Sequence, residues 1–254
     1  MIPSEFANRV VLVTGGGRNL GHAIASGFAR GGASVAISVR ENVAEGEAAV
    51  RQLAESGARQ AMLTVGNVAD PAVCASMVAE VTAKLGPIDI LVNAVGIRPH
   101  KPFADISAEE WRLVFDTNCS SAFYLSQAAL PSMVERGFGR IISLGGSGPG
   151  RAGKLHSHIS VSKAALAMLM SEIALSYGPD GVTANTVVPG PMNTKRDHPP
   201  ANWPPSREAL AQRMAIPRLG EPSEIAATCT FLASEGAAYI TGQQIKVNGG
   251  SEMW

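Results

Sequence analysis

Side chains suited to acid–base chemistry gather between residues 139 and 170, where a polar loop follows a short apolar run. Ser147 can supply a hydroxyl, and His156 supplies an imidazole, a side-chain type suited to acid–base chemistry near neutral pH. Lys163 follows His156 by close to two helical turns, so both share one face if a helix begins early. His158 lies about 140° from Lys163 on the same wheel and is expected to point elsewhere. An α/β enzyme would hold its catalytic groups here, although both histidines can also be ordinary polar residues at a helix start.

A second candidate site is the glycine-rich segment TGGGRNLG at residues 14–21, which follows the apolar run at residues 10–13. Backbone N–H groups of such a turn face an anion, and the dipole of the following helix favours negative charge. Asn19 tolerates a left-handed backbone better than other non-glycine residues, so a glycine-like turn survives there. Glycines also make tight turns with no ligand, but this position predicts a dinucleotide site.

Two arginines bear on which dinucleotide is bound. Arg40 ends the second predicted strand, where an acidic residue would hold a ribose 2′-hydroxyl, and Arg18 lies in the glycine-rich turn. Each can be a solvated surface residue. Together they suit a 2′-phosphate through charge-assisted bidentate contacts, so the sequence predicts NADP(H) over NAD(H).

Short apolar runs alternate with helical patterns along the whole chain, which predicts an α/β fold. The predicted strands cover residues 10–13, 34–39, 60–65, 88–93, 141–144, 183–188 and 240–247. Predicted helices cover about 43–56, 71–85, 108–130, 155–177 and 223–233, with one more after the glycine-rich turn. Right-handed crossovers make the seven-stranded sheet doubly wound and mostly parallel, with helices on both faces. We expect one domain over residues 1–254, with ligands at the carboxyl ends of the strands.

Composition narrows the class of protein. The 254 residues have a formal net charge of zero, which argues against nucleic acid or an anionic membrane as the main partner. We expect no membrane span, because no run of about 18 apolar residues is evident. The start of the chain lacks the pattern of a secretion signal, and the three cysteines are widely spaced. These features predict a cytoplasmic protein with reduced thiols.

The motifs taken together resemble the short-chain dehydrogenase/reductase family, of the classical single-domain Rossmann type, over essentially the whole chain. The matching segments are TGGGRNLG at 14–21, Asn67-Val68, NAVG at 93–96, Asn118, Lys163, PGPMNT at 189–194 and ITGQQIKVNGG at 240–250. Three segments depart from the family's pattern: Asn19 replaces its middle glycine, Asn67 replaces its Asp, and NAVG replaces NNAG.

The resemblance implies a nicotinamide dinucleotide. It would be held by Gly15, Gly17, Arg18, Asn19, Leu20, Gly21 and Arg40 near its phosphates and ribose, by Asn67 and Val68 near its adenine, by Asn93, Ala94, Gly96 and Lys163 near its second ribose, and by Pro189, Gly190, Met192 and Thr194 near its nicotinamide.

Catalysis in this family requires a Tyr four residues before the Lys and a Ser thirteen residues before that Tyr. Those positions hold Ile159 and Gly146 here. Isoleucine has no titratable proton, so the usual tyrosine mechanism is excluded. Asn118 and Lys163 match the family, while Ser147 and His156 are the candidates to replace the missing groups. No metal site is predicted.

The segment at residues 191–217 resembles a substrate lid, and His100 and Lys101 would line the same mouth. Lys101, Lys195 and Arg196 could attract an anionic substrate or could be solvated charges. The long helices resemble the family's dimer-forming pair and the C-terminal strand region its second interface, which implies a homotetramer.

Three functions fit these features. The first is an NADP-dependent oxidoreductase acting on a carbonyl or alcohol, or on an activated C=C bond, with a non-standard proton donor. The second is a non-redox lyase or isomerase on the same fold. The third is a catalytically silent nucleotide-binding or partner subunit.

Overall fold

The computed structural model describes residues 5–146, 155–195, 209, 211–212 and 214–253. Within them, seven strands form one sheet in the order β3-β2-β1-β4-β5-β6-β7. The strands are β1 (Val10–Val13), β2 (Ser34–Val39), β3 (Gln60–Val65), β4 (Ile90–Asn93), β5 (Gly139–Leu144), β6 (Val182–Pro189) and β7 (Gln244–Val247). Every pairing is parallel, where the sequence predicted a mostly parallel sheet. The strand order reverses between β1 and β4, which is where doubly wound sheets bind ligands.

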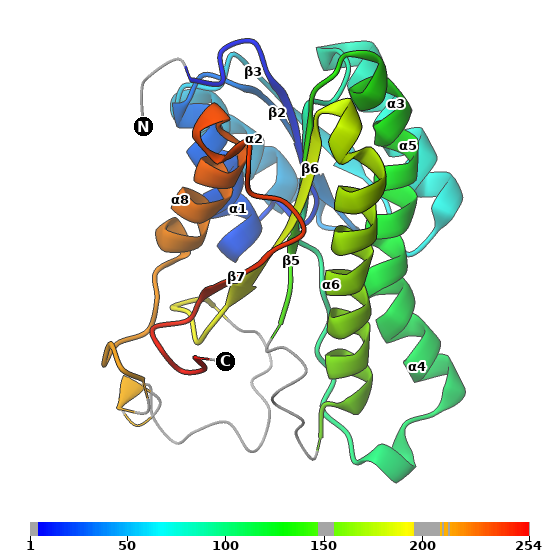
Figure 1. Ribbon diagram of the computed structural model, residues 1–254, viewed down its shortest axis with the longest axis vertical. Coiled ribbons are helices and arrows are strands. Elements are labelled where there is room, and N and C mark those ends of the chain that lie inside the picture. The colour runs from blue at the N-terminus through cyan, green and yellow to red at the C-terminus, as the bar shows by residue number, and fades with distance from the viewer. Residues whose placement is uncertain (1–4, 147–154, 196–208, 210, 213, 254) are drawn as a thin grey trace.

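Helices cover both faces of the sheet (Figure 1). They are α1 (Asn19–Arg30), α2 (Val43–Glu55), α3 (Pro71–Leu85), α4 (Ala108–Phe115), α5 (Ser121–Glu135), α6 (Ser157–Tyr177) and α8 (Pro222–Ala233). One apolar core lies between the sheet and α1, α2 and α8, and a second lies between the sheet and α3, α5 and α6. Strands β1, β2, β4 and β5 are buried throughout, as a parallel sheet covered on both faces requires.

The helix predicted over 108–130 is interrupted and extended. A π-helical segment, Asp116–Ser120, joins α4 to α5, and its Thr117, Asn118 and Cys119 are buried. Such π turns frequently lie at functional sites. The prediction also ended the helix near Pro131, but α5 continues through it to Glu135.

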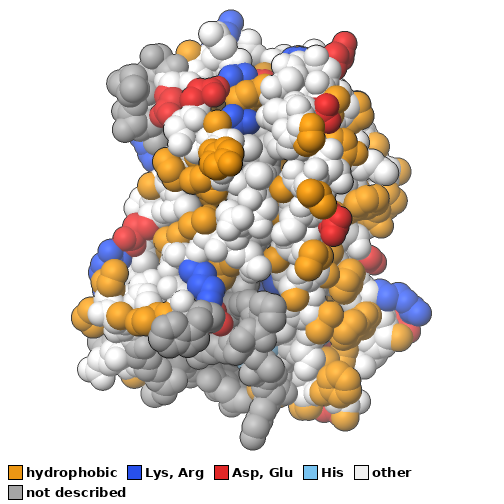
Figure 2. Space-filling model, viewed as in Figure 1, with side chains coloured by type: hydrophobic (Ala, Val, Ile, Leu, Met, Phe, Trp, Pro, Cys, Tyr) orange, Lys and Arg blue, Asp and Glu red, His pale blue; other side chains and the backbone are white. Residues whose placement is uncertain are grey.

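The helix α6 corrects the expectation that no segment is apolar enough to cross a membrane. By length and composition alone, residues 157–180 would qualify. However, Leu166, Met170 and Ile173 are buried in the core on one side of the sheet. We therefore treat α6 as a core helix. Figure 2 shows further hydrophobic side chains on the outer surface of the half of the molecule where α6 lies.

The last predicted strand is shorter than expected. It was predicted from residue 240, whereas β7 begins at Gln244. Gly242 has a left-handed φ of +70°, which is incompatible with a regular strand. Hydrogen bonds still tie this segment to β6, because Gly242 N donates to Ala184 O and Asn185 Nδ2 donates to Ile240 O.

Candidate active site

The turn after β1 is built so closely that only glycine fits at some positions. A Cβ on Gly16 would lie 2.5 Å from the Ile37 side chain, and a Cβ on Gly21 would lie 2.1 Å from the carbonyl oxygen of Gly15. Gly15 itself has a left-handed φ of +65°. Gly17 packs against Val39, and Leu20 packs against the core under α1. The N-terminus of α1 makes no side-chain capping hydrogen bond and has no acidic residue in its first turn, so its N–H groups can serve an anion.

Asn19 adopts the left-handed backbone that the sequence predicted for it. Its φ is +51°, and it is the only non-glycine residue with a positive φ in the described part of the chain. Its side chain also contacts the segment after β6: Nδ2 donates to Lys195 O and Oδ1 accepts from Lys195 N, each at 3.1 Å. Asn19 therefore joins the glycine-rich turn to the first residues of the predicted lid.

The two arginines predicted to select the cofactor are both exposed near this turn. Arg18 is the N-cap residue of α1, and Arg40 follows directly after β2. The Nε of Arg40 lies 2.8 Å from Glu41 Oε1, but both side chains are largely exposed. An ion pair of this kind stabilises little, so a phosphate can displace it.

An unpaired acceptor lies at the end of β4. Asn93 Nδ2 donates to Ser143 Oγ at 3.2 Å, whereas the buried Oδ1 of Asn93 has no hydrogen-bond partner among the described residues. Buried acceptors are almost always satisfied, so a ligand hydroxyl fits this atom. Ala94 N donates to Thr14 Oγ1 at 3.1 Å, which ties this strand end to the glycine-rich turn. The glycine cradle and the Asn93 oxygen together fit a nicotinamide dinucleotide.

Lys163 and Asn118 meet below the ends of β4 and β5. Lys163 is buried, and its Nζ donates to Leu144 O at 2.6 Å. The Asn118 side chain is fixed by Ile97, whose N donates to Oδ1 at 2.8 Å and whose O accepts from Nδ2 at 3.1 Å. A Cβ on Gly96 would lie 3.4 Å from both Asn118 Oδ1 and Lys163 Nζ. The structure therefore brings together these three residues, which are far apart in the sequence.

The surroundings of Lys163 destabilise its charged form. Burial, and secondarily the positive charge of Arg98, lower the pKa of Lys163 to about 7. A lysine with such a pKa exchanges protons near neutral pH. Arg98 was not among the candidate residues, although its position two residues after NAVG was a signal that could have identified it.

Two residues without acid–base chemistry flank Lys163. Ile159 lies one helical turn earlier on α6 and is buried. A Cβ on Gly146 would lie 3.2 Å from Lys163 Cγ, so a larger residue at position 146 would contact the lysine stem. Ser147, proposed as a substitute hydroxyl, lies outside the described residues.

His156 does not lie on the helix with Lys163. The helix begins at Ser157, and His156 is its N-cap residue. The register that would place both side chains on one face therefore does not apply. The ring of His156 contacts that of His100 edge to face, with centroids 4.5 Å apart. Its buried Nδ1 has no hydrogen-bond partner in the described part of the chain.

Glu110 of α4 lies close to two basic side chains, those of His158 and Lys101. Its Oε1 lies 3.5 Å from Nε2 of the buried His158, and burial lowers the pKa of this histidine. Lys101 forms an ion pair with the other oxygen of Glu110. Lys101 is thus partnered rather than available to an anionic substrate, and sequence reasoning did not identify Glu110 as the partner.

The segment after β6 contacts β7 and the chain at Gly220. Gly190 N donates to Val247 O at 3.0 Å, and Met192 forms a bridge with Gly220. Pro189 ends β6, and Thr194 N donates to Met192 O. Of the remaining predicted cofactor residues, Asn67 Oδ1 accepts from Ala69 N, and Val68 is buried. Arg196 lies outside the described residues, as does most of the predicted lid.

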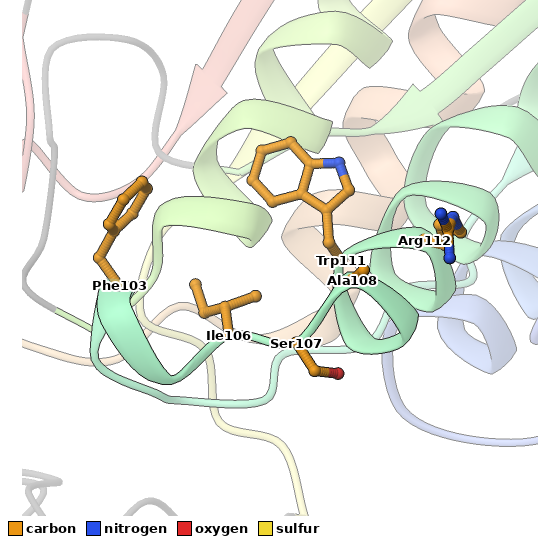
Figure 3. A pocket seen from close by; sticks show the side chains of 6 residues that line it. All are labelled: Phe103, Ile106, Ser107, Ala108, Trp111 and Arg112. Atoms are coloured by element: carbon orange, nitrogen blue, oxygen red, sulfur yellow. The ribbon is translucent and has the colours of Figure 1, made fainter.

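A shallow groove lies at the start of α4, with a volume of about 410 Å³. Its lining is Phe103, Ile106, Ser107, Ala108, Trp111 and Arg112. Figure 3 shows the side chains of Phe103 and Trp111 on either side of Ile106, with Arg112 at the far side. Arg112 is the only charged residue in the lining, so the groove lacks the acid–base groups that catalysis requires.

Comparisons with known proteins agree with this geometry. Residues 15–252 match the family described as Enoyl-(Acyl carrier protein) reductase. The chain is 36% identical to Nodulation protein G of Azospirillum brasilense over 96% of this chain and 98% of that protein. It is 35% identical to the 3-oxoacyl-[acyl-carrier-protein] reductase of Escherichia coli (strain K12) over 98% and 99% of the two chains. The crystal structure of a blue fluorescent protein from a metagenomic library, in complex with NADPH, superposes with a TM-score of 0.87 at 33% identity, covering 97% and 98%.

Proposed function

The chain belongs to the short-chain dehydrogenase/reductase family of NAD(P)-dependent oxidoreductases, and from this premise we propose that it uses NADP(H) to interconvert a carbonyl and an alcohol on a small molecule with a non-standard proton donor. The observation that carries the proposal is the buried Lys163 beside Asn118 and Gly96, next to an unpaired Asn93 oxygen. We also propose that Ile159 and Gly146 occupy the positions of the family's Tyr and Ser.

In this proposal the residues that would hold the cofactor lie at the carboxyl ends of β1 and β4. Gly15, Gly21 and the first N–H groups of α1 would hold the phosphates, and Asn93 Oδ1 would accept a hydrogen bond from a ribose hydroxyl. The segment from Pro189 to Thr194 would cover the nicotinamide. When bound, the nicotinamide supplies or accepts a hydride, and the substrate oxygen gains or loses one proton.

Arg18 and Arg40 support the preference for NADP(H). Both are exposed beside the turn, and guanidinium groups bind a 2′-phosphate through paired hydrogen bonds. One structural relative was solved in complex with NADPH.

For the proton donor we propose Lys163. Its pKa of about 7 suits proton transfer near neutral pH, and its Nζ keeps donors beyond the one bonded to Leu144 O. Asn118 fixes the backbone at Ile97 and so keeps this pocket in place. His156 is the alternative donor, because its Nδ1 is unpartnered in the described chain.

The proposal is tested first by fluorescence titration with NADPH and, in parallel, NADH. We expect micromolar binding with NADPH preferred, and loss of that preference in Arg40→Leu. Binding of neither dinucleotide would overturn the redox role and favour the silent subunit. If NADPH binds but is never oxidised during turnover, the lyase or isomerase would be favoured.

A substrate with an activated C=C bond is the second candidate. Reduction of such a bond depends less on an acidic side chain at position 159. The matching family is described as Enoyl-(Acyl carrier protein) reductase. Product analysis after incubation with NADPH and an enone distinguishes the two, since one route gives the saturated ketone and the other the allylic alcohol.

We further propose a cytoplasmic homotetramer built from one domain, with residues 191–217 as a lid over the substrate. Val161, Met168 and Leu175 recur every seven residues on α6, and all three are exposed large hydrophobic residues. Such a stripe suits pairing with a second copy. Size-exclusion chromatography with light scattering should give four chains, and Leu175→Lys should reduce that mass. A monomeric wild-type protein would contradict this assembly.

A further inference from the structure

In the part of the chain that the structure describes, Arg98 is a cation without an acidic partner at the edge of the active site. Among the described residues, its guanidinium forms no ion pair with a carboxylate and donates no hydrogen bond. The nearby Lys101 differs, because Glu110 neutralises it. Arg98 nevertheless keeps a surface exposed to solvent, so a ligand can reach it.

The backbone next to Arg98 is fixed against the catalytic groups. Ile97 exchanges two hydrogen bonds with the Asn118 side chain, and Gly96 lies close to Lys163 Nζ. Arg98 follows directly on this clamped segment. Its charge is close enough to Lys163 to contribute to the lowered pKa of that lysine.

The clamped segment therefore carries Arg98 beside the catalytic groups, and neither Arg98 nor Lys163 forms an ion pair with a carboxylate among the described residues. Desolvation by the surrounding protein lowers the pKa of Arg98, although part of the side chain stays exposed to solvent. Removing water from unpaired like charges is unfavourable, and an anion between them relieves both the desolvation and the repulsion. A guanidinium offers a planar fork of donors that matches a carboxylate.

We propose that Arg98 binds the carboxylate of the substrate, and that the substrate is a short oxo acid or the corresponding hydroxy acid. This inference rests on the proposed function, because it places the reacting carbonyl beside Lys163. Arg98 is two residues from Gly96, where a Cβ would lie 3.4 Å from Lys163 Nζ, so the chain between the carboxylate and the carbonyl is short.

The redox step is balanced without any further reactant. With acetoacetate as the oxo acid, the C3 carbon gains the hydride of NADPH and the C3 oxygen gains one proton. The carbonyl double bond is lost, and 3-hydroxybutanoate and NADP⁺ are the products. The carboxylate stays bound to Arg98 and is chemically unchanged.

The test is isothermal titration of the full chain, with saturating NADP⁺ and without it, using two matched pairs of probes. These are acetoacetate with ethyl acetoacetate and pyruvate with methyl pyruvate, so each pair differs in the negative charge. We expect at least one acid to bind while its ester does not. Arg98→Gln should weaken that acid by roughly tenfold or more, and Arg98→Lys by less, because the lysine keeps charge but lacks the fork.

Arg112→Gln is the matched control, because Arg112 is an exposed arginine of the neighbouring groove (Figure 3). It should bind the acids like the wild type. The inference is overturned if no acid binds at about 10 mM, if esters bind as well as acids, or if Arg98→Gln binds like the wild type. Binding of inorganic phosphate in place of both acids would overturn the carboxylate assignment.

A second measurement reports on Lys163 directly. Removing a nearby like charge raises a lysine pKa, so NMR titration of labelled lysines should show the Lys163 pKa higher in Arg98→Gln and unchanged in Arg112→Gln. An unchanged pKa in Arg98→Gln would also count against the inference. The NADPH titration is a separate experiment. If NADPH does not bind, the proposed function is refuted, but the acid titrations without NADP⁺ still decide the role of Arg98.

Discussion

The turn after β1 and the segment after β5 both lead from a fully buried strand into a helix at the same end of the sheet, but they build a site from different parts of the chain. The first uses backbone: close-packed glycines and the free N–H groups of α1. The second uses side chains, chiefly Lys163, whose Nζ is bonded to the strand end at Leu144 O.

This difference explains which substitutions each region accepts. At position 19 the turn needs only a left-handed backbone, and Asn19 provides it with a φ of +51°. At position 159 the proposed chemistry needs a particular functional group. Ile159 fills its buried place on α6 without supplying a proton. A backbone site can therefore survive sequence change that alters the reaction of a side-chain site.

Gly21→Ala should produce the largest effect, because it blocks the backbone site directly. The new methyl group would lie 2.1 Å from the carbonyl oxygen of Gly15, so the turn must move. We expect NADPH affinity to fall by about 100-fold or more and the free energy of unfolding to fall by about 3 kcal/mol. NADPH titration and urea denaturation measure the two effects.

Gly236→Ala is the control for that substitution, since a Cβ there would make only an ordinary contact, 3.5 Å from Ser234 Oγ. It should leave NADPH binding unchanged and stability within about 0.5 kcal/mol. Wild-type affinity in Gly21→Ala would show that the turn does not hold the cofactor.

The double change Ile159→Tyr with Gly146→Ser tests the side-chain site. If these positions lack only the usual acid and hydroxyl, NADPH-dependent reduction of a simple ketone such as cyclohexanone should rise by roughly 100-fold. The serine will press on the lysine stem, because a Cβ at position 146 lies 3.2 Å from Lys163 Cγ. Steady-state kinetics following NADPH absorbance measures the gain.

Ile159→Phe with Gly146→Ser is the matched control, because it adds the ring without the hydroxyl. It should stay at the wild-type rate. If the tyrosine variant also stays there, the missing residues are not what limits ketone reduction.

The backbone region was largely predictable from sequence, because its signals are local. The β1 strand, the turn and the conformation of Asn19 follow from an apolar run, a glycine cluster and the properties of one residue type. Pro131 shows where local signals fail. Its neighbours Leu130 and Met133 are both buried in the core, and this packing keeps α5 helical through the proline.

The side-chain region was less predictable, because its contacts join distant segments. Glu110 lies on α4, yet it faces both His158 and Lys101. No periodicity relates residues 110 and 158. Whether His156 lies on the helix depends on the exact first residue of α6. Helix ends are the least certain part of any helix prediction. Arg98 became notable only when the structure placed Gly96 and Ile97 against Lys163 and Asn118 and gave Arg98 no acidic partner among the described residues.

Lys163→Met should remove a pH dependence of stability. The folded protein holds this lysine at a pKa of about 7, against 10.5 as its ordinary value. Between these values the unfolded chain binds more protons, so stability rises with pH across this window, by at most about 1.4 kcal/mol per pH unit. Below pH 7 the full cost of burying the charge is present.

Urea denaturation between pH 7 and 8.5 should therefore show a shallower rise in Lys163→Met than in the wild type. Lys84→Met is the control, because Lys84 is exposed and its ion pair with Glu80 is a surface one. Equal slopes in the wild type and Lys163→Met would mean that the lysine is not desolvated as its surroundings indicate.

Asn19 offers the finest test of the comparison, since it serves the backbone site through both its backbone and its side chain. Asn19→Gly keeps the left-handed turn and loses the two hydrogen bonds to Lys195. Asn19→Ala loses the same bonds and adds the strain of a Cβ in the left-handed region, about 1 kcal/mol. The loss shared by both variants thus measures the contact with Lys195, and the difference between them measures the strain. We expect NADPH affinity to fall a fewfold in both variants and the free energy of unfolding to be lower in Asn19→Ala. If the alanine variant is as stable as the glycine variant, the turn is not fixed in its left-handed conformation, and the distinction between a rigid backbone site and an adaptable side-chain site would be lost.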